Sequence, residues 1–428
     1  MKRFWLVLLS LGLITAFSTS VFAVDVKFSG SYYAGGMYLD KTTLVKDAGN
    51  STAFYFQRLR VQTDFIVSPG LTLTTRFDAM ERAWGAARTA PGTGLDTQSA
   101  GTIAENENIA FDYAYVTYNS PIGIFKVGYQ PGATWGTIFG NGETPQTKIS
   151  HSIAFGNFSF TTQLLKVIEK STTVKNPAGY ADADKDQIYL MPMYTWSAGR
   201  AGLFYSYSND TSTRPGVDGY KTRQHQLMPF VEAKLGPVAL QAELIYITGK
   251  QRYDGAGADI DIDNLGGWVD ATATFNPIYF GATFAYVSGD DPGTAGKKEG
   301  GSVTGGNDWN PCLILWNYDR AYWAGALDGN STSMTNAFFY QGRAGVKPID
   351  KLDIMASVSY AYADEKPIGY QNDEYGWEVD LVGTYKITNN LSYMLGFGYL
   401  FTGDYYKGAT NVNVQDDFTV INKLTLTF

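Results

Sequence analysis

The sequence repeats a segment of about ten residues in which every second position is apolar or aromatic. The clearest example is residues 391–402, where the apolar or aromatic positions are Leu391, Tyr393, Leu395, Phe397, Tyr399 and Phe401. The residues between them are mostly smaller or polar. A period of two places alternate side chains on opposite faces of a strand, whereas an amphipathic helix would show spacings of three and four. We therefore expect strands with one apolar and one more polar face.

The composition agrees with this pattern. The 428 residues include 30 Tyr, 25 Phe, 9 Trp and 47 Gly, a blend typical of strands and turns. A net charge of -8 disfavours binding to nucleic acid. The single cysteine, Cys312, excludes an intrachain disulfide, a Cys-x-x-Cys-His haem attachment and a cysteine-rich zinc site.

The first 23 residues have the order of regions that marks a secretory signal peptide. Met1-Lys2-Arg3 supplies a basic start, residues 4–17 are apolar, and Val21-Phe22-Ala23 precedes the expected cleavage site. Such segments direct export and are removed. We predict a signal peptide over 1–23 and a mature chain over 24–428 that forms a single domain.

After this segment, no run approaches the roughly 18 consecutive apolar residues that a membrane-spanning helix needs. A sheet can cross lipid only when it closes on itself, because each backbone N–H and C=O must find a partner within the protein. Eight short turn signals alternate with nine longer polar stretches. These connections predict an all-β fold, a transmembrane antiparallel β-barrel of 18 strands with short periplasmic turns and long extracellular loops. Sixteen strands is the alternative, because 149–156 and 186–197 alternate weakly.

The end of the chain carries a further signal. Residues 418–428 have apolar side chains at every second position and end in Phe428, although Asn422 interrupts the apolar face. With the signal peptide and the aromatic residues near strand ends, this segment resembles the closing strand of a Gram-negative outer-membrane porin. The resemblance is architectural and spans the whole mature chain. It implies that Leu424, Leu426 and Phe428 form the signal read by the barrel-assembly machinery.

The resemblance also implies a function and a location. A porin is a multi-pass protein of the bacterial outer membrane that lets small hydrophilic solutes and ions diffuse passively. The implied partners are outer-membrane lipid, lipopolysaccharide, the assembly machinery and the solutes, and a homotrimer is compatible with it. We expect no catalysis, because neither His151 nor His225 lies in a nucleophile motif. We expect no cofactor and no metal, since the aspartates at 259–263 lack the glycine and glutamate of a calcium loop.

Two other functions stay open at this point. The barrel could be a substrate-specific outer-membrane channel, or a sleeve that holds an electron-transfer partner across the membrane. A specific channel would saturate with its solute, and a sleeve would copurify with a haem protein.

The face opposite the apolar one carries ionisable residues, which are costly at the lipid midplane but suit a wet lumen. Arg58, Arg60 and Asp64 share one parity, and Arg76 and Asp78 share the corresponding parity of the next strand. The same face of later strands carries Asp112, Lys126, Glu232, Lys234, Glu243, Asp270, Arg343, Asp353, Glu378 and Asp380. We predict that the three arginines form a basic ladder on one wall, either free to select ions or paired with neighbouring acids. Because both charge signs occur, anion and cation preference stay open.

The third long loop, at about 130–148, is rich in glycine and aromatic residues. It resembles the porin loop that folds into the barrel and narrows it. On this interpretation Glu143 faces the basic wall, and Trp135 and Phe139 anchor the loop. The predicted pore constriction is therefore Arg58, Arg60, Arg76, Asp78, Glu143, Trp135 and Phe139, and selectivity would follow from its diameter and its charges.

Overall fold

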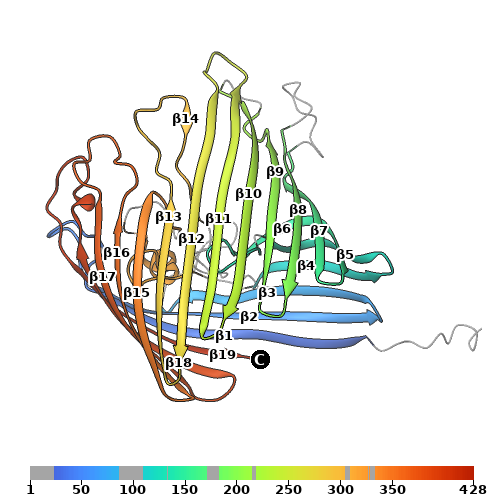
Figure 1. Cartoon of the computed structure of the whole chain (residues 1–428), viewed down its shortest axis with the longest axis horizontal. Helices are drawn as coiled ribbons and strands as arrows, with labels where there is room; N and C mark the ends of the chain where they lie inside the picture. The colour runs from blue at the N-terminus through green and yellow to red at the C-terminus, as the bar shows by residue number, and fades with distance from the viewer. Residues whose placement is uncertain are drawn as a thin grey trace, which may run out of the picture.

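The computed structural model describes residues 24–85, 109–132, 134–170, 183–214, 218–303, 309–325, 327 and 333–428. Within them the chain forms one sheet whose first strand, β1, pairs with β2 on one side and with the last strand, β19, on the other (Figure 1). The sheet is therefore a closed barrel. The predicted signal peptide lies outside the described residues.

Eighteen strands form the barrel, and each pairs antiparallel with its neighbours. They are β1 (Asp25–Leu39), β2 (Thr52–Ser68), β3 (Leu71–Ala83), β4 (Ile109–Ser120), β5 (Gly123–Gly132), β6 (Thr144–Phe155), β7 (Phe158–Ile168), β8 (Lys185–Trp196), β9 (Gly199–Asp210), β10 (Tyr220–Leu235), β11 (Val238–Tyr253), β12 (Ile260–Phe275), β13 (Ile278–Val287), β15 (Ala337–Ile349), β16 (Leu352–Tyr362), β17 (Glu374–Lys386), β18 (Leu391–Thr402) and β19 (Asp417–Thr427). The two-residue β14 (Lys297–Lys298) lies in a loop and pairs parallel with β12.

The predicted 18-strand barrel is confirmed, and the 16-strand alternative is wrong. The two weakly alternating stretches are the strands β6 and β8. Short turns join strand pairs at one end, as at Gly236, and long connections lie at the other. The third loop is shorter than the predicted 130–148, because Gly132 pairs with Thr144 and Gln130 with Gln146. The pairing of β5 with β6 includes glycine and proline residues whose composition favours a loop.

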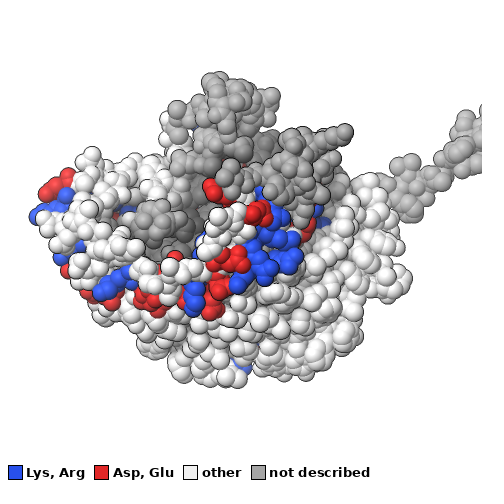
Figure 2. Space-filling view, turned by 90° about the horizontal axis from the view of Figure 1, so that it is seen from above, with Lys and Arg blue, Asp and Glu red and all other residues white. Residues whose placement is uncertain are grey.

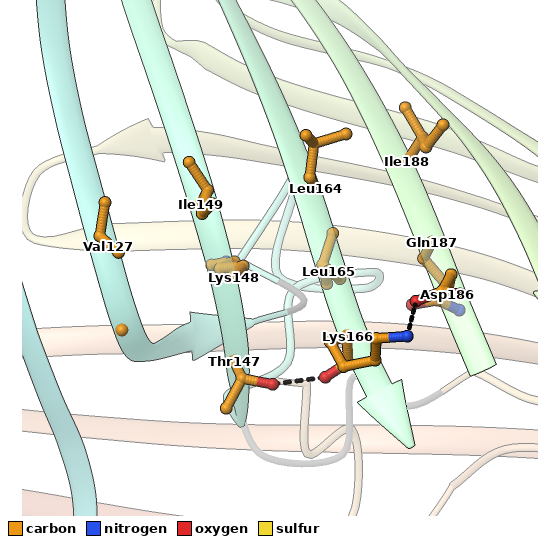
Figure 3. A pocket seen from close by; sticks show the side chains of 11 residues that line it. Val127, Thr147, Lys148, Ile149, Leu164, Leu165, Lys166, Asp186, Gln187 and Ile188 are labelled. Carbon is orange, nitrogen blue, oxygen red and sulfur yellow. Dashed lines mark hydrogen bonds and ion pairs between the residues drawn. The ribbon is translucent and has the colours of Figure 1, made fainter. Parts of the chain in front are cut away.

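The outer surface of the barrel is apolar. Four neighbouring strands place Val127, Ile149, Leu164 and Ile188 side by side on the outside (Figure 3). They line a groove of about 560 Å³. A groove of this chemistry on the outer wall suits the acyl chains of lipid rather than a hydrophilic solute.

The closing strand, β19, also directs its apolar side chains Leu424 and Leu426 to the outer surface. Leu424 pairs with Ala34 and Leu426 with Tyr32. Asn422, on the same parity, donates a hydrogen bond from Nδ2 to the backbone oxygen of Gly36 at 3.4 Å. The residue that interrupts the apolar face of this strand is therefore a side-chain amide that is hydrogen-bonded to the backbone of β1.

Two segments between strands fill part of the lumen. The first, residues 134–143 between β5 and β6, is called here the third-loop segment. The second, residues 309–325 between β13 and β15, is called the 309–325 segment and contains the helix α2 (Tyr318–Ala324). A single 3₁₀ turn, η3 (Asp404–Lys407), lies between β18 and β19. None of the helices in the described ranges is long and apolar enough to cross a membrane.

Candidate permeation site

The predicted arginine ladder lies on β2 and β3, facing the lumen, and each of its arginines contacts acids. Arg60 donates two hydrogen bonds to Asp78, at 2.6 and 2.7 Å, and a third to Asp112 at 3.2 Å. Arg76 contacts Asp112 at 3.1 and 3.2 Å. The Arg58 guanidinium lies 3.4 Å from Glu81. Paired guanidinium groups of this geometry are fixed in direction, and their charges are partly balanced.

Glu143 of the third-loop segment completes this network. Its carboxylate contacts Arg76, accepts a hydrogen bond from the Tyr113 hydroxyl, and lies 3.3 Å from Arg60. The Arg76 guanidinium also stacks over the Tyr113 ring, 3.7 Å from its centroid. Glu143 therefore touches the basic wall directly, with no gap between the opposite charges.

The protonation of Glu143 follows from these contacts. Burial raises the pKa of its carboxyl, but the Tyr113 hydrogen bond and the charges of Arg76 and Arg60 act in the opposite direction and together outweigh it. The resulting pKa lies below the ordinary value for glutamic acid. Glu143 is therefore ionised at neutral pH.

A second acid holds the third-loop segment to the opposite wall. Glu243 of β11 accepts hydrogen bonds from both the backbone N–H and the hydroxyl of Thr137, each at 2.7 Å. A Cβ atom at Gly140 would lie 2.0 Å from a Glu243 oxygen, and one at Gly136 would lie 2.4 Å from the other. The glycines noted in the sequence allow the loop backbone to approach this carboxylate.

Aromatic contacts add to this attachment. Trp135 donates a hydrogen bond to the backbone oxygen of Met228 at 3.0 Å and packs edge-on against Phe230. Phe139 is fully buried and stacks on Trp268 of β12 with ring centroids 5.9 Å apart. Phe139 also meets Trp309 of the 309–325 segment, at 5.1 Å. The two segments thus touch each other inside the barrel.

The 309–325 segment is held by a buried glutamate of β17. Glu378, 0% exposed, accepts hydrogen bonds from the backbone N–H groups of Leu313, Ile314 and Leu315 at 3.0, 2.7 and 2.7 Å. Buried N–H groups need such acceptors, since leaving one unpaired costs about 1–3 kcal/mol. Glu378 therefore fixes the backbone of this segment against the wall.

The helix α2 is fixed by charge as well. Asn317 caps it by accepting a hydrogen bond from the Arg320 N–H at 2.9 Å. The Arg320 side chain reaches Asp417 of β19 at 3.0 Å, and Asp319 contacts Lys423. Trp323 stacks on Phe56 of β2, with ring centroids 4.9 Å apart. This short helix therefore packs against the strands at which the barrel closes.

Two tyrosines of α2 lie close to the arginine ladder. Burial raises the pKa of Tyr318 and of Tyr322, and the negative charge of Glu81 raises both further while Arg58 lowers them. Both phenols are therefore uncharged at neutral pH. On the face shown in Figure 2, Lys and Arg residues lie side by side with Asp and Glu residues in one band, and other residue types make up most of the remaining described surface.

One group of side chains has donors close enough to share an ion. Cys312, Glu378 and Asp380 are buried and place ligand atoms within 4.8 Å of one another. The Glu378 oxygens, however, already accept three backbone N–H groups, and the Cys312 thiol donates to Ser359 at 3.3 Å. The arrangement is explained by attachment of the segment.

The structure brings the predicted ladder residues and Glu143 into contact, whereas the sequence pattern assigned no role to the 309–325 segment. The only local signal there is the apolar surroundings of Cys312, with Trp309, Pro311 and Trp316 nearby. In the structure Cys312 is buried. The partners of the segment, such as Glu378 and Asp417, are too far along the chain for a local pattern to reveal.

Comparisons with known proteins agree with this architecture. The sequence profile of the Gram-negative porin family matches residues 10–405. Among curated protein sequences, none matches this chain at a significant level. Solved structures of the same fold include OccK11 (OpdR) of Pseudomonas aeruginosa, 15% identical with a TM-score of 0.52, covering 94% of this chain and 96% of that one. A BenF-like porin from Pseudomonas fluorescens Pf-5 is 10% identical with a TM-score of 0.53, covering 94% and 99%.

Another neighbour is OccK2 (OpdF) of Pseudomonas aeruginosa, solved in complex with glucuronate, with 12% identity, a TM-score of 0.53 and coverage of 94% and 98%. The fold and the lumen thus define an outer-membrane diffusion channel. The chain belongs to the Gram-negative porin family. It is a porin of the bacterial outer membrane through which small solutes diffuse passively.

Proposed function

We propose that the permeation path of this porin narrows beside the arginine ladder, and that the charges there set its ion preference. The observation that carries the proposal is the contact of Glu143, from the third-loop segment, with Arg60 and Arg76. Fixed charges of both signs at one level of a wet lumen act directly on passing ions. Trp135 and Phe139 hold the loop that brings Glu143 there.

The local charge balance indicates a weak preference. Arg58, Arg60 and Arg76 contribute three positive charges, and Asp78, Glu81, Asp112 and Glu143 contribute four negative ones. The net charge of this cluster is -1 when all seven groups are ionised. We therefore propose a slight cation preference in the wild type.

The experiment is a reversal-potential measurement across planar bilayers with a salt gradient. The double variant Arg60→Gln/Arg76→Gln leaves four acids and one arginine, a net charge of -3, so its cation-to-anion permeability ratio should rise by roughly five- to tenfold. Arg214→Gln, which removes an ion pair with Asp254 in the outer loops, is the matched control and should leave the ratio unchanged. An unchanged ratio in the double variant contradicts the proposal.

A sleeve for an electron-transfer partner fits this lumen poorly. The third-loop segment and the 309–325 segment occupy the space between the walls and meet at Phe139 and Trp309. A partner held across the membrane would have to displace both. A substrate-specific channel is a second candidate, because the same contact narrows the lumen. Current that saturates with one solute, and not with salt alone, would identify it.

The ends of the chain bear on export and assembly. β1 begins at Asp25, two residues beyond the proposed cleavage site after Ala23.

Phe428 exchanges backbone hydrogen bonds with Gly30 at 2.8 and 3.0 Å, and its half-exposed ring lies over that glycine. We propose that this end is read by the assembly machinery, so deletion of Phe428 should lower the amount of heat-modifiable barrel in outer membranes. Native mass spectrometry would show whether the porin forms the homotrimer that is compatible with the family resemblance.

A further inference from the structure

Two neighbouring strands carry four cations at their loop ends. These are Lys221 and Arg223 of β10 and Lys250 and Arg252 of β11, called here the β10–β11 basic patch. Lys221 pairs directly with Arg252 across the strands, and Arg223 pairs directly with Lys250. β10 and β11 stand side by side in the wall (Figure 1).

The patch faces outward. Along β10, Met228 and Phe230 are buried toward the lumen, while Leu227, on the parity of Arg223, is exposed on the outer surface. Along β11, Glu243 faces the lumen, and exposed Leu244 shares the parity of Lys250 and Arg252. The four cations therefore lie on the lipid side of the barrel, near its loop end.

An aromatic layer lies next to the patch. The Tyr205 hydroxyl lies 2.9 Å from Nδ1 of His225, and the Tyr207 ring is 5.2 Å from the His225 ring. Polar aromatic residues of this kind mark the boundary between acyl chains and head groups. The patch begins two residues beyond His225 toward the loops, so it lies at the level of the head groups.

Like charges that face each other across strands destabilise a sheet, and here two such pairs follow one another. Lys250 lies 3.1 Å from Asp261 and Arg252 lies 3.8 Å from Asp259, so two of the cations are partly balanced. Within the described part of the chain, Lys221 and Arg223 form no ion pair within 4.0 Å. The patch surrounds a shallow cavity of about 290 Å³ that His225 and Gly249 also line.

A second outward-facing cation shows a different arrangement. Lys166 of β7 lies 2.8 Å from Asp186, 3.0 Å from Asp184 and 3.4 Å from Glu169, and its contact with Asp186 is drawn in Figure 3. Lys166 is thus neutralised by the protein itself. Lys221 and Arg223 leave their charge available to a partner from outside.

We propose that the β10–β11 basic patch binds the phosphorylated head group of the outer leaflet glycolipid, lipopolysaccharide. Clustered lysine and arginine at a membrane surface attract anionic head groups, and arginine binds phosphate through paired N–H groups. The phosphate lies between the like-charged pairs and relieves their repulsion. The chain's outer-membrane location places such head groups at this level. Lys221 and Arg223, the two cations of the patch without an ion pair in the described residues, match a doubly charged phosphate better than an uncharged sugar.

The test uses purified full-length porin in a neutral detergent, with bisphosphorylated lipid A as the probe and dephosphorylated lipid A as its comparison. Bound lipid is measured by native mass spectrometry. The variant Lys221→Gln/Arg223→Gln should bind bisphosphorylated lipid A roughly 30-fold more weakly than the wild type. The matched control Lys234→Gln, on the lumen parity and at the turn end of the same strand, should bind as the wild type does.

Thermal unfolding separates a binding defect from a folding defect. Without lipid, the variant should melt at or slightly above the wild-type temperature, because the repulsion is removed. With lipid A, only the wild type should gain stability. Equal binding of the dephosphorylated lipid, equal stabilisation by inorganic phosphate, or unchanged binding by the variant would overturn the proposal. Loss of an oligomer with unchanged lipid binding would also overturn it, since the patch would then be a contact between copies.

Discussion

Each of the two segments inside the barrel is held to the wall by a glutamate, but their other attachments differ. In each, a wall glutamate accepts hydrogen bonds from loop N–H groups: Glu243 for the third-loop segment and Glu378 for the 309–325 segment. The third-loop segment then extends its own partly exposed acid, Glu143, to the arginine ladder. The 309–325 segment instead buries Arg320 against Asp417, which are 2% and 1% exposed.

This difference separates two roles. Charges that stay near water can act on passing ions, whereas charges removed from water mainly fix the backbone. We therefore expect changes in the 309–325 segment to alter the size of the pore, and changes at Glu143 to alter its selectivity.

The largest effect is expected from Glu378→Ala. Three buried N–H groups lose their acceptor, at a cost of about 1–3 kcal/mol each, so the 309–325 segment should leave the wall and the unitary conductance should rise. Cys312, the only cysteine, is a built-in reporter. Burial raises the pKa of its thiol, and the nearby acids raise it further, so it should resist maleimide in the wild type and react readily in the variant.

The control for this change is Glu232→Ala. Glu232 also faces the lumen, but its partner is the Arg200 side chain rather than a loop backbone. Rapid labelling of Cys312 in this control, or slow labelling in Glu378→Ala, would show that Glu378 does not hold the segment.

A smaller change in conductance is expected from Glu243→Ala. The third-loop segment loses both hydrogen bonds of Thr137 but keeps Trp135, Phe139 and Glu143 in contact with the walls. Single-channel recordings should therefore show a modest rise in conductance and more current noise. Gly140→Ala should act in the same direction, because its Cβ would collide with Glu243. A quiet, wild-type current in both variants would contradict this attachment.

Glu143→Gln should change selectivity with little change in conductance. Removing one negative charge from the ladder should shift the permeability ratio toward anions by roughly fivefold at low ionic strength, and by less at high salt because of screening. The shift is opposite to that expected for the double arginine variant. If both variants move the ratio in the same direction, charge is not its cause.

The smallest effect is expected from pH. Because the pKa of Glu143 lies below the ordinary value, the carboxylate and the stability it contributes should persist as pH falls from 7 to about 5. Both should be lost only at lower pH, as the solution passes through the folded-state pKa of this carboxyl. The difference in reversal potential between the wild type and Glu143→Gln should stay constant down to about pH 5, and a loss of that difference near pH 6 would refute the assignment.

The sequence predicted the barrel well because strand parity is a local signal. Alternation at 391–402 and the charged parity of Arg58 and Arg60 depend only on neighbouring residues and on the two environments of a membrane sheet. The limits of the third loop were less accurate, because Pro131 and Pro145 face each other within a ladder. The composition of this stretch favours a loop, but its residues pair as strands.

The burial of the 309–325 segment could not be predicted in this way. Its fixed points, Glu378 and Asp417, appeared in the sequence as an ordinary lumen acid and a residue near the closing strand. Only closure of the barrel brings them to Leu313 and Arg320.

The β10–β11 basic patch could not be predicted from the sequence, for a related reason. Parity alone says which residues of one strand share a face, but it does not say which residues of the next strand lie opposite them. The register of β10 against β11 is needed to bring Lys221 beside Arg252 and Arg223 beside Lys250.

The most direct test of the central claim, that solutes pass the arginine ladder, is modification of Arg60→Cys in a Cys312→Ser background during single-channel recording. A cationic and an anionic methanethiosulfonate reagent should each reduce the unitary current in a single step, and should shift the permeability ratio in opposite directions. Current and ratio that stay unchanged, with modification of the cysteine verified by mass spectrometry, would place the permeation path elsewhere.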